Sequence, residues 1–302
     1  MKNKENKKKN KPIDEHAEVK AYFYGSTIEL TNGIGPKEPK TKVIKGHRYV
    51  VLKTGEIKEM NRSAEKRTDN IESVKRTMKH LRRLIGTNFT SNTINRRDQL
   101  WITLTYKDNI NALDQNSSKV VYQDFKRFIR KIRKKYNPTI EYLAVLEPQA
   151  SGRWHLHVLM KTLDHSTLYI PNSDLEELWG KGFTSTKRLK NSDNVSAYVM
   201  AYVSNVQIDL KTTDKNKANS KKIIKGGRLS FYPKGVRIYR RSKKLIDPKT
   251  TKGPKRHILS EINEKLSEPK VYSRKFRDKY GNQMRIKTEF YVKKGENYGK
   301  ND

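Results

Sequence analysis

The chain has 302 residues. Its hydrophobic content of 33% and mean hydropathy of -0.96 favour a compact core in roughly half of the chain, with basic extensions around it. Its 67 Lys and Arg against 32 Asp and Glu give a net charge of +35, which favours nucleic acid over a membrane as partner, because no amphipathic basic helix with an aromatic face is evident. The absence of cysteine excludes disulfides and thiolate metal sites, and the lack of a signal segment or long apolar run predicts a soluble, cytoplasmic protein.

The first third of the chain is predicted to flank the main domain. Residues 1–17 are expected to be a disordered basic tail, because lysines dominate their first part and apolar side chains are nearly absent there. Residues 18–96 form a basic accessory region in this interpretation. It holds short β elements at 18–31 and 48–60 and an amphipathic helix at 63–84.

The middle of the chain has more regular patterns, and residues 97–247 are predicted to form one α+β domain. An apolar strand at 100–106 precedes an amphipathic helix that ends at Asn137-Pro138. Two strands at 140–147 and 153–160 follow, joined by a hairpin loop at 148–152, then a helix at 173–179, a strand at 183–189 and a helix at 194–206. This order favours a central, mainly antiparallel sheet flanked by helices. Residues 248–302 are expected to be a basic C-terminal region.

Two histidines within one predicted strand suggest a metal site. His155 and His157 are two residues apart, so both imidazoles project from the same face of the strand. If residues 148–152 form the loop, Glu147 lies opposite Arg153 and on the same face as the histidines. Two imidazoles and a carboxylate leave coordination positions for water and substrate. An exposed glutamate at a strand end is the alternative interpretation. For a cation that grips a phosphate, Mg²⁺ or Mn²⁺ is favoured.

The predicted helix at 194–206 carries the candidate nucleophiles. Tyr198 and Tyr202 are four residues apart and therefore share one helix face. A tyrosine with an ordinary pKa of about 10 becomes a competent nucleophile when a metal polarises the phosphate that it attacks. Two aromatic side chains on the packed side of an amphipathic helix are the alternative explanation.

Taken together, these motifs resemble the HUH rolling-circle replication initiators, particularly the two-tyrosine type of phages and mobile elements. The resemblance covers roughly residues 98–245. It rests on Ile102-Thr103-Leu104-Thr105, on EPQASGRWHLHVL with Glu147, His155 and His157, and on YVMAYVSN with both tyrosines. It differs from relatives at Ala201 and Asn205, where relatives often carry lysines. Another basic residue, such as Lys187, Arg188 or Arg237, would have to replace them.

The resemblance implies an HUH endonuclease fold with basic N- and C-terminal extensions, and a nicking and closing reaction. A tyrosine attacks one strand of a single-stranded or hairpin origin, keeps the 5′ end as a phosphotyrosine and leaves a 3′-OH that primes synthesis. Because rejoining reverses this step, no nucleotide cofactor is required. No P-loop motif occurs in the sequence, so a host helicase and replication proteins are expected partners.

Basic side chains beside apolar and aromatic residues are the predicted DNA contacts. They are Lys126, Arg127, Arg130, Lys187, Arg188, Arg237, Arg240 and Arg241. Solvated surface charges are the alternative explanation for any one of these runs. Three other functions also stay open: a conjugative relaxase, a single-tyrosine transposase, and a non-catalytic origin-binding protein.

Overall fold

The computed structural model describes residues 10–33, 41–60, 71–89, 97–107, 117–149, 151–189, 232–233, 235–277 and 283–294. The chain divides into two compact units: Ser63–Asp247, and Met1–Arg62 together with Pro248–Asp302. Antiparallel sheets with few helices build both units, so the expected α+β class is confirmed. None of the helices in the described ranges is long and apolar enough to cross a membrane.

The unit Ser63–Asp247 is built on a five-stranded antiparallel sheet in the order β10-β7-β8-β6-β9. Long apolar runs form its central strands, which are buried on both faces. The strands are β6 (Gln99–Thr105), β7 (Glu141–Pro148), β8 (Trp154–Lys161), β9 (Thr184–Arg188) and β10 (Tyr239–Arg241); the helices are α1 (Ile71–Phe89), α2 (Ser117–Lys135) and α3 (Asn172–Trp179).

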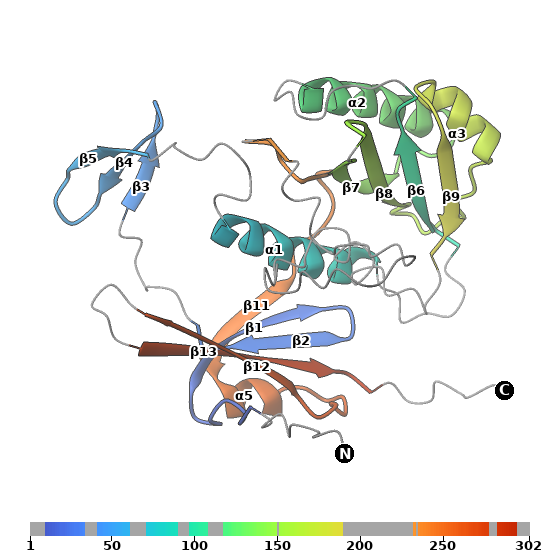
Figure 1. Cartoon of the computed structure of the whole chain (residues 1–302). Coiled ribbons are helices and arrows are strands. Elements are labelled where there is room, and N and C mark those ends of the chain that lie inside the picture. Colours follow the sequence, from blue (N-terminus) through green and yellow to red (C-terminus); the bar gives the residue numbers. More distant parts are fainter. Residues whose placement is uncertain are drawn as a thin grey trace, which may run out of the picture. The chain divides into compact units, whose positions relative to one another are not determined.

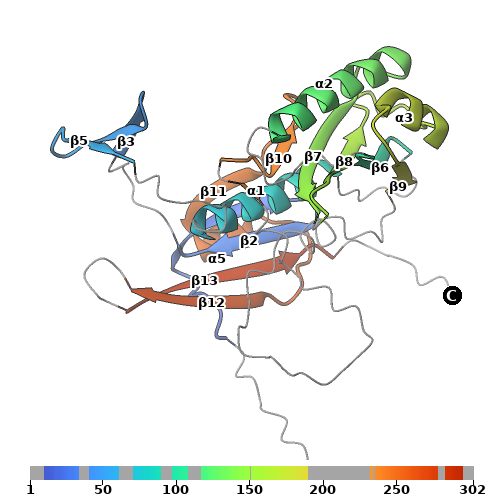
Figure 2. The ribbon, with the colours of Figure 1, turned by 45° about the horizontal axis from the view of Figure 1, so that its top comes forward.

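Helices cover both faces of this sheet (Figures 1 and 2). On one face, Phe125 of α2 packs edge-on against Tyr142 at 5.0 Å, and Trp179 of α3 packs against Tyr106 at 5.1 Å. On the other face, the ring of His80 in α1 lies 6.3 Å from that of Tyr239. The sheet is therefore the middle layer of three, and each face can be recognised from the parity of its residues along a strand.

The hairpin of β7 and β8 differs from the predicted register by two residues. Glu147 pairs with His155 rather than with Arg153, because β7 continues through Pro148 and the loop comprises residues 149–153. The backbone N–H of Gln149 donates to the carbonyl of Arg153 at 2.8 Å and closes this loop. A shift of two residues keeps every side chain on its original face, so the predicted proximity of Glu147 to both histidines survives the correction.

The second unit contains a five-stranded antiparallel sheet in the order β11-β1-β2-β13-β12, with α5 packed against it, and a separate three-stranded sheet in the order β3-β4-β5. A two-residue turn joins β1 to β2, and Gly25 at φ 53° provides the backbone conformation that this turn requires. The elements are β1 (Glu18–Tyr24), β2 (Thr27–Thr31), β3 (Thr41–Ile44), β4 (Arg48–Val51), β5 (Ile57–Glu59), β11 (Lys249–Pro254), α5 (Lys255–Ser260), β12 (Lys270–Arg277) and β13 (Gln283–Val292).

The structure groups the flanking regions differently from the sequence-based segmentation. We expected 18–96 and 248–302 to be separate, but β1 pairs with β11 and β2 pairs with β13. Ile13, which we assigned to a disordered tail, is buried with Ile258 in the core of this unit. The helix that we expected in the accessory region is α1, which belongs to the unit Ser63–Asp247 and packs its apolar stripe into the core of that unit. Burial of apolar side chains therefore places Ile13 within the second unit and α1 within the unit Ser63–Asp247.

Candidate functional site

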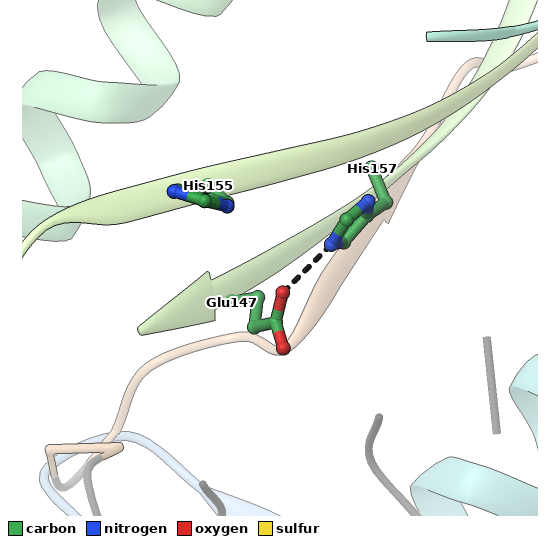
Figure 3. A group of neighbouring side chains, drawn as sticks. All are labelled: Glu147, His155 and His157. Atoms are coloured by element: carbon green, nitrogen blue, oxygen red, sulfur yellow. Dashed lines mark hydrogen bonds and ion pairs between the residues drawn. The ribbon is translucent and has the colours of Figure 1, made fainter. Parts of the chain in front are cut away.

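Glu147, His155 and His157 lie together at one end of the sheet in the unit Ser63–Asp247. Each offers a ligand atom, and these atoms all lie within 4.8 Å of one another. The closest pair is Nε2 of His157 and Oε2 of Glu147, at 2.7 Å (Figure 3). We call these three residues the triad. They share a face because β7 and β8 pair Glu147 with His155 and Val145 with His157.

The triad is largely buried, so water shields the charge of its carboxylate only weakly. Glu147 is 1% exposed and His157 is 9% exposed, whereas His155 is partly exposed. A carboxylate removed from water requires a proton, a cation or strong hydrogen-bond donors to compensate its charge. Two imidazoles beside a buried carboxylate form a donor set that fits a divalent cation, with His155 on the accessible side.

Strand β6 supports His157 from the side. Thr103 pairs with His157, and its Oγ1 lies 3.4 Å from Nδ1 of that imidazole. The indole of Trp101 lies 5.8 Å from the same ring, between centroids. A hydrogen bond to one ring nitrogen orients an imidazole and selects the nitrogen that is available as a ligand. Thr103 belongs to the motif Ile102-Thr103-Leu104-Thr105, whose sequence alone gives it no role; the pairing of β6 with β8 places it beside His157.

The end of β6 beside the triad depends on a glycine. Gly182 has a φ of 147°, and a Cβ added there would lie 2.4 Å from the backbone nitrogen of Lys107 and 2.6 Å from the carbonyl oxygen of Thr105. The backbone N–H of Lys107 donates to the carbonyl of Lys181 at 2.7 Å across this contact. Only glycine allows the two chains to approach so closely.

The two candidate nucleophiles, Tyr198 and Tyr202, lie outside the described residues. On the described strands of this sheet, Tyr239 shares the face of the triad, because it pairs with Val145 and Val145 pairs with His157. Burial raises the pKa of Tyr239, which disfavours the phenolate form at this position.

The predicted DNA-binding residues divide between the two sides of the sheet. Lys187 lies on the face of the triad, where its ammonium group stands 5.7 Å from the ring centroid of Trp101. Arg188 pairs with Leu100 and therefore faces the α2 side. The exposed side chains of α2 also lie on that side, away from the triad: Lys126, Arg127 and Arg130.

The remaining three arginines line a pocket of about 430 Å³ at β10, the edge strand of the sheet. Arg240 stacks on the ring of Tyr122 at 3.9 Å, and the carbonyl of Arg237 accepts a hydrogen bond from the hydroxyl of Tyr122 at 2.8 Å. Arg241 makes two hydrogen bonds to Asp247, at 2.7 and 2.9 Å, and this pairing lowers the pKa of the Asp247 carboxyl. A guanidinium paired in this way is less available to a phosphate than Arg237 or Arg240.

Comparison with known proteins gives one family match. Residues 99–207 match the sequence model of a family described as replication-associated protein ORF2. This match supports the role of a replication initiator. No curated protein and no solved structure shows significant similarity to the chain.

The matched segment, residues 99–207, contains the whole triad and both candidate tyrosines. It begins at the first residue of β6 and includes β7, β8, α2, α3 and β9. The match therefore covers the part of the sheet that carries the triad, and it leaves β10, α1 and the second unit outside. A role in replication implies that the chain interacts with DNA.

Proposed function

We propose that this chain starts rolling-circle replication of a mobile element by cutting one strand at an origin with a tyrosine. The observation that carries the proposal is the triad: two imidazoles and a buried carboxylate on one face of a sheet, within a segment that matches a replication-associated family. His155 is its partly exposed member, and we propose that the DNA strand approaches the triad from this side.

We propose that Glu147, His155 and His157 hold Mg²⁺ or Mn²⁺. When bound, such an ion supplies positive charge that polarises the scissile phosphate and stabilises the charge that develops on it. Thr103 keeps His157 oriented by accepting a hydrogen bond from Nδ1–H, which leaves Nε2 as the ligand atom. The burial of Glu147 keeps this carboxylate in a fixed position.

The phenol oxygen of Tyr198 or Tyr202 forms a bond to phosphorus, while the bond from phosphorus to the 3′ oxygen breaks. The phenol proton passes to solvent, and the released 3′ oxygen takes a proton from solvent. The products are a 5′-phosphotyrosine and a 3′-OH that primes synthesis. Because the phosphotyrosine retains the energy of the cut bond, the reverse attack rejoins the strand without a nucleotide cofactor. A host helicase is the proposed source of unwinding.

Incubation with a supercoiled plasmid that carries the element's origin tests this function. With Mn²⁺ or Mg²⁺ we expect nicked circles and a protein–DNA adduct that survives denaturant, and neither product in EDTA. The double variant Tyr198→Phe/Tyr202→Phe should form no adduct, and each single variant identifies which tyrosine cuts first. If wild-type protein binds the origin but cuts nothing with either metal, the chain is a non-catalytic origin-binding protein.

A further inference from the structure

An exposed aromatic side chain lies in line with the triad, one strand beyond β6. Phe183 immediately precedes β9 and is 65% exposed. Its carbonyl accepts a hydrogen bond from the N–H of Thr105 at 2.9 Å, and Thr105 pairs with His155. Across the sheet, the order is therefore Glu147, His155, Thr105 and Phe183. Two strand spacings separate the last residue from His155, about 10 Å.

The alternation of side chains along β9 assigns Phe183 to the face of the triad. Thr184 is fully buried on the opposite face, where its hydroxyl donates to the side chain of Asn172 in α3 at 3.1 Å. Lys187, four residues after Phe183, lies over Trp101 on the triad's face. Residues 183, 185 and 187 therefore project from one side of the strand.

Exposure of a phenylalanine is ordinary by itself, so the surroundings of the ring decide its role. On the described strands β6 and β9, its neighbours on this face with exposed or partly exposed side chains are polar or charged: Thr103, Thr105, Ser185 and Lys187. Trp101 shares this face but is buried. An apolar helix or peptide segment needs a continuous apolar surface, which these neighbours do not provide. One aromatic ring among hydroxyls and a cation instead matches the surfaces on which single-stranded nucleic acid lies, with a base stacked on the ring and phosphates near the cation.

We propose that Phe183 stacks against one base of single-stranded DNA that crosses the triad, and that Lys187 contacts a phosphate of the same strand. This inference rests on the proposed function only in that the strand passes the triad. Stacking on Phe183 holds the strand in register with the metal ligands, and it requires no particular base, because every base offers a flat face.

The test measures binding of the full chain to a fluorescein-labelled 12-nucleotide dT strand by fluorescence anisotropy in EDTA. Phe183→Ala should weaken binding by about 5- to 100-fold, the effect of removing one base–aromatic stack, with an unchanged dependence on salt. Phe183→Leu should weaken it similarly, and Phe183→Trp should retain it. Tyr169→Ala is the matched control: Tyr169 is an aromatic residue that is 64% exposed and lies outside the β9 face.

A second strand identifies the contact as stacking. On a 12-nucleotide abasic strand with the same phosphates, wild type and Phe183→Ala should bind equally. On the dT strand, Lys187→Ala should make the negative slope of log affinity against log salt shallower by about 0.7, because one phosphate contact is lost. The proposal is overturned if Phe183→Ala binds dT within twofold of wild type, if Tyr169→Ala loses as much, or if the loss persists on the abasic strand. Because EDTA prevents metal-dependent cutting, these outcomes do not depend on whether the chain is a nickase. The Leu and Trp variants, compared at equal folded fraction by circular dichroism, separate loss of stacking from loss of folding.

Discussion

His157 and His155 differ in burial, so their removal should have different effects on the metal-free protein. His157 is 9% exposed, and its Nε2 lies 2.7 Å from the carboxylate of Glu147, which is itself 1% exposed. His157→Ala therefore leaves a buried carboxylate without its nearest partner. His155→Ala removes a partly exposed side chain, and it should lower the free energy of unfolding by only about 1 kcal/mol or less.

The magnitude for His157→Ala follows from leaving the buried carboxylate of Glu147 without this hydrogen-bond partner, which costs about 3 kcal/mol. For a unit of this size, that corresponds to a fall in Tm of about 6–12 °C. The double variant Glu147→Gln/His157→Ala should recover part of the loss, because it also removes the buried charge.

Thermal unfolding in EDTA, followed by circular dichroism, measures these effects. His257→Ala is the control, since His257 is an exposed histidine of the other unit. Addition of Mn²⁺ at about 100 times its Kd should stabilise wild type by about 2.7 kcal/mol. It should stabilise neither His155→Ala nor His157→Ala, because each lacks one of the ligands. Equal Tm values in EDTA for His155→Ala and His157→Ala would refute the reasoning from burial.

Three further predictions concern the support of the sheet. Gly182→Ala should lower the free energy of unfolding by at least about 2 kcal/mol, measured by urea titration, because its Cβ would lie 2.4 Å from the nitrogen of Lys107; a loss below about 0.5 kcal/mol would contradict the close approach. Tyr106→Phe should lower the free energy of unfolding by about 1–2 kcal/mol, because the hydroxyl of Tyr106 donates to the buried Asp124 at 3.0 Å. Burial also raises the pKa of Tyr106, so an absorbance titration should show this phenol still protonated above about pH 10. Burial lowers the pKa of His80, so its stabilising contribution is present above about pH 6.5 and is lost as pH falls through its folded-state pKa. His80→Gln should therefore flatten the dependence of the free energy of unfolding on pH below about pH 6.5. An unchanged pH dependence would contradict this.

Local patterns predicted the central sheet and the proximity of the triad. The His155/His157 spacing fixes a common face, and any register error of two residues keeps Glu147 on that face, which is why the prediction survived an incorrect loop boundary. The apolar run of β6 and the periodicity of α2 were equally informative, because in both segments burial dictates the pattern.

Long-range pairing and basic strands could not be predicted in the same way. Strands β11 and β12 consist largely of polar and basic residues, so no apolar alternation marks them; their pairing with distant strands decides their conformation. The position of Arg188 and of the α2 cations on the side away from the triad depends on the three-layer arrangement, which charge runs do not encode.

The most direct test of the account is to identify the residue that carries the DNA. After reaction with the element's single-stranded origin DNA and Mn²⁺, nuclease and trypsin digestion should yield a peptide within residues 191–211 that bears a phosphonucleotide, and fragmentation should locate it on Tyr198 or Tyr202. The same adduct should be absent from His157→Ala. A cut strand with no phosphotyrosine, or an adduct on a residue outside this peptide, would contradict the proposal of a tyrosine nickase.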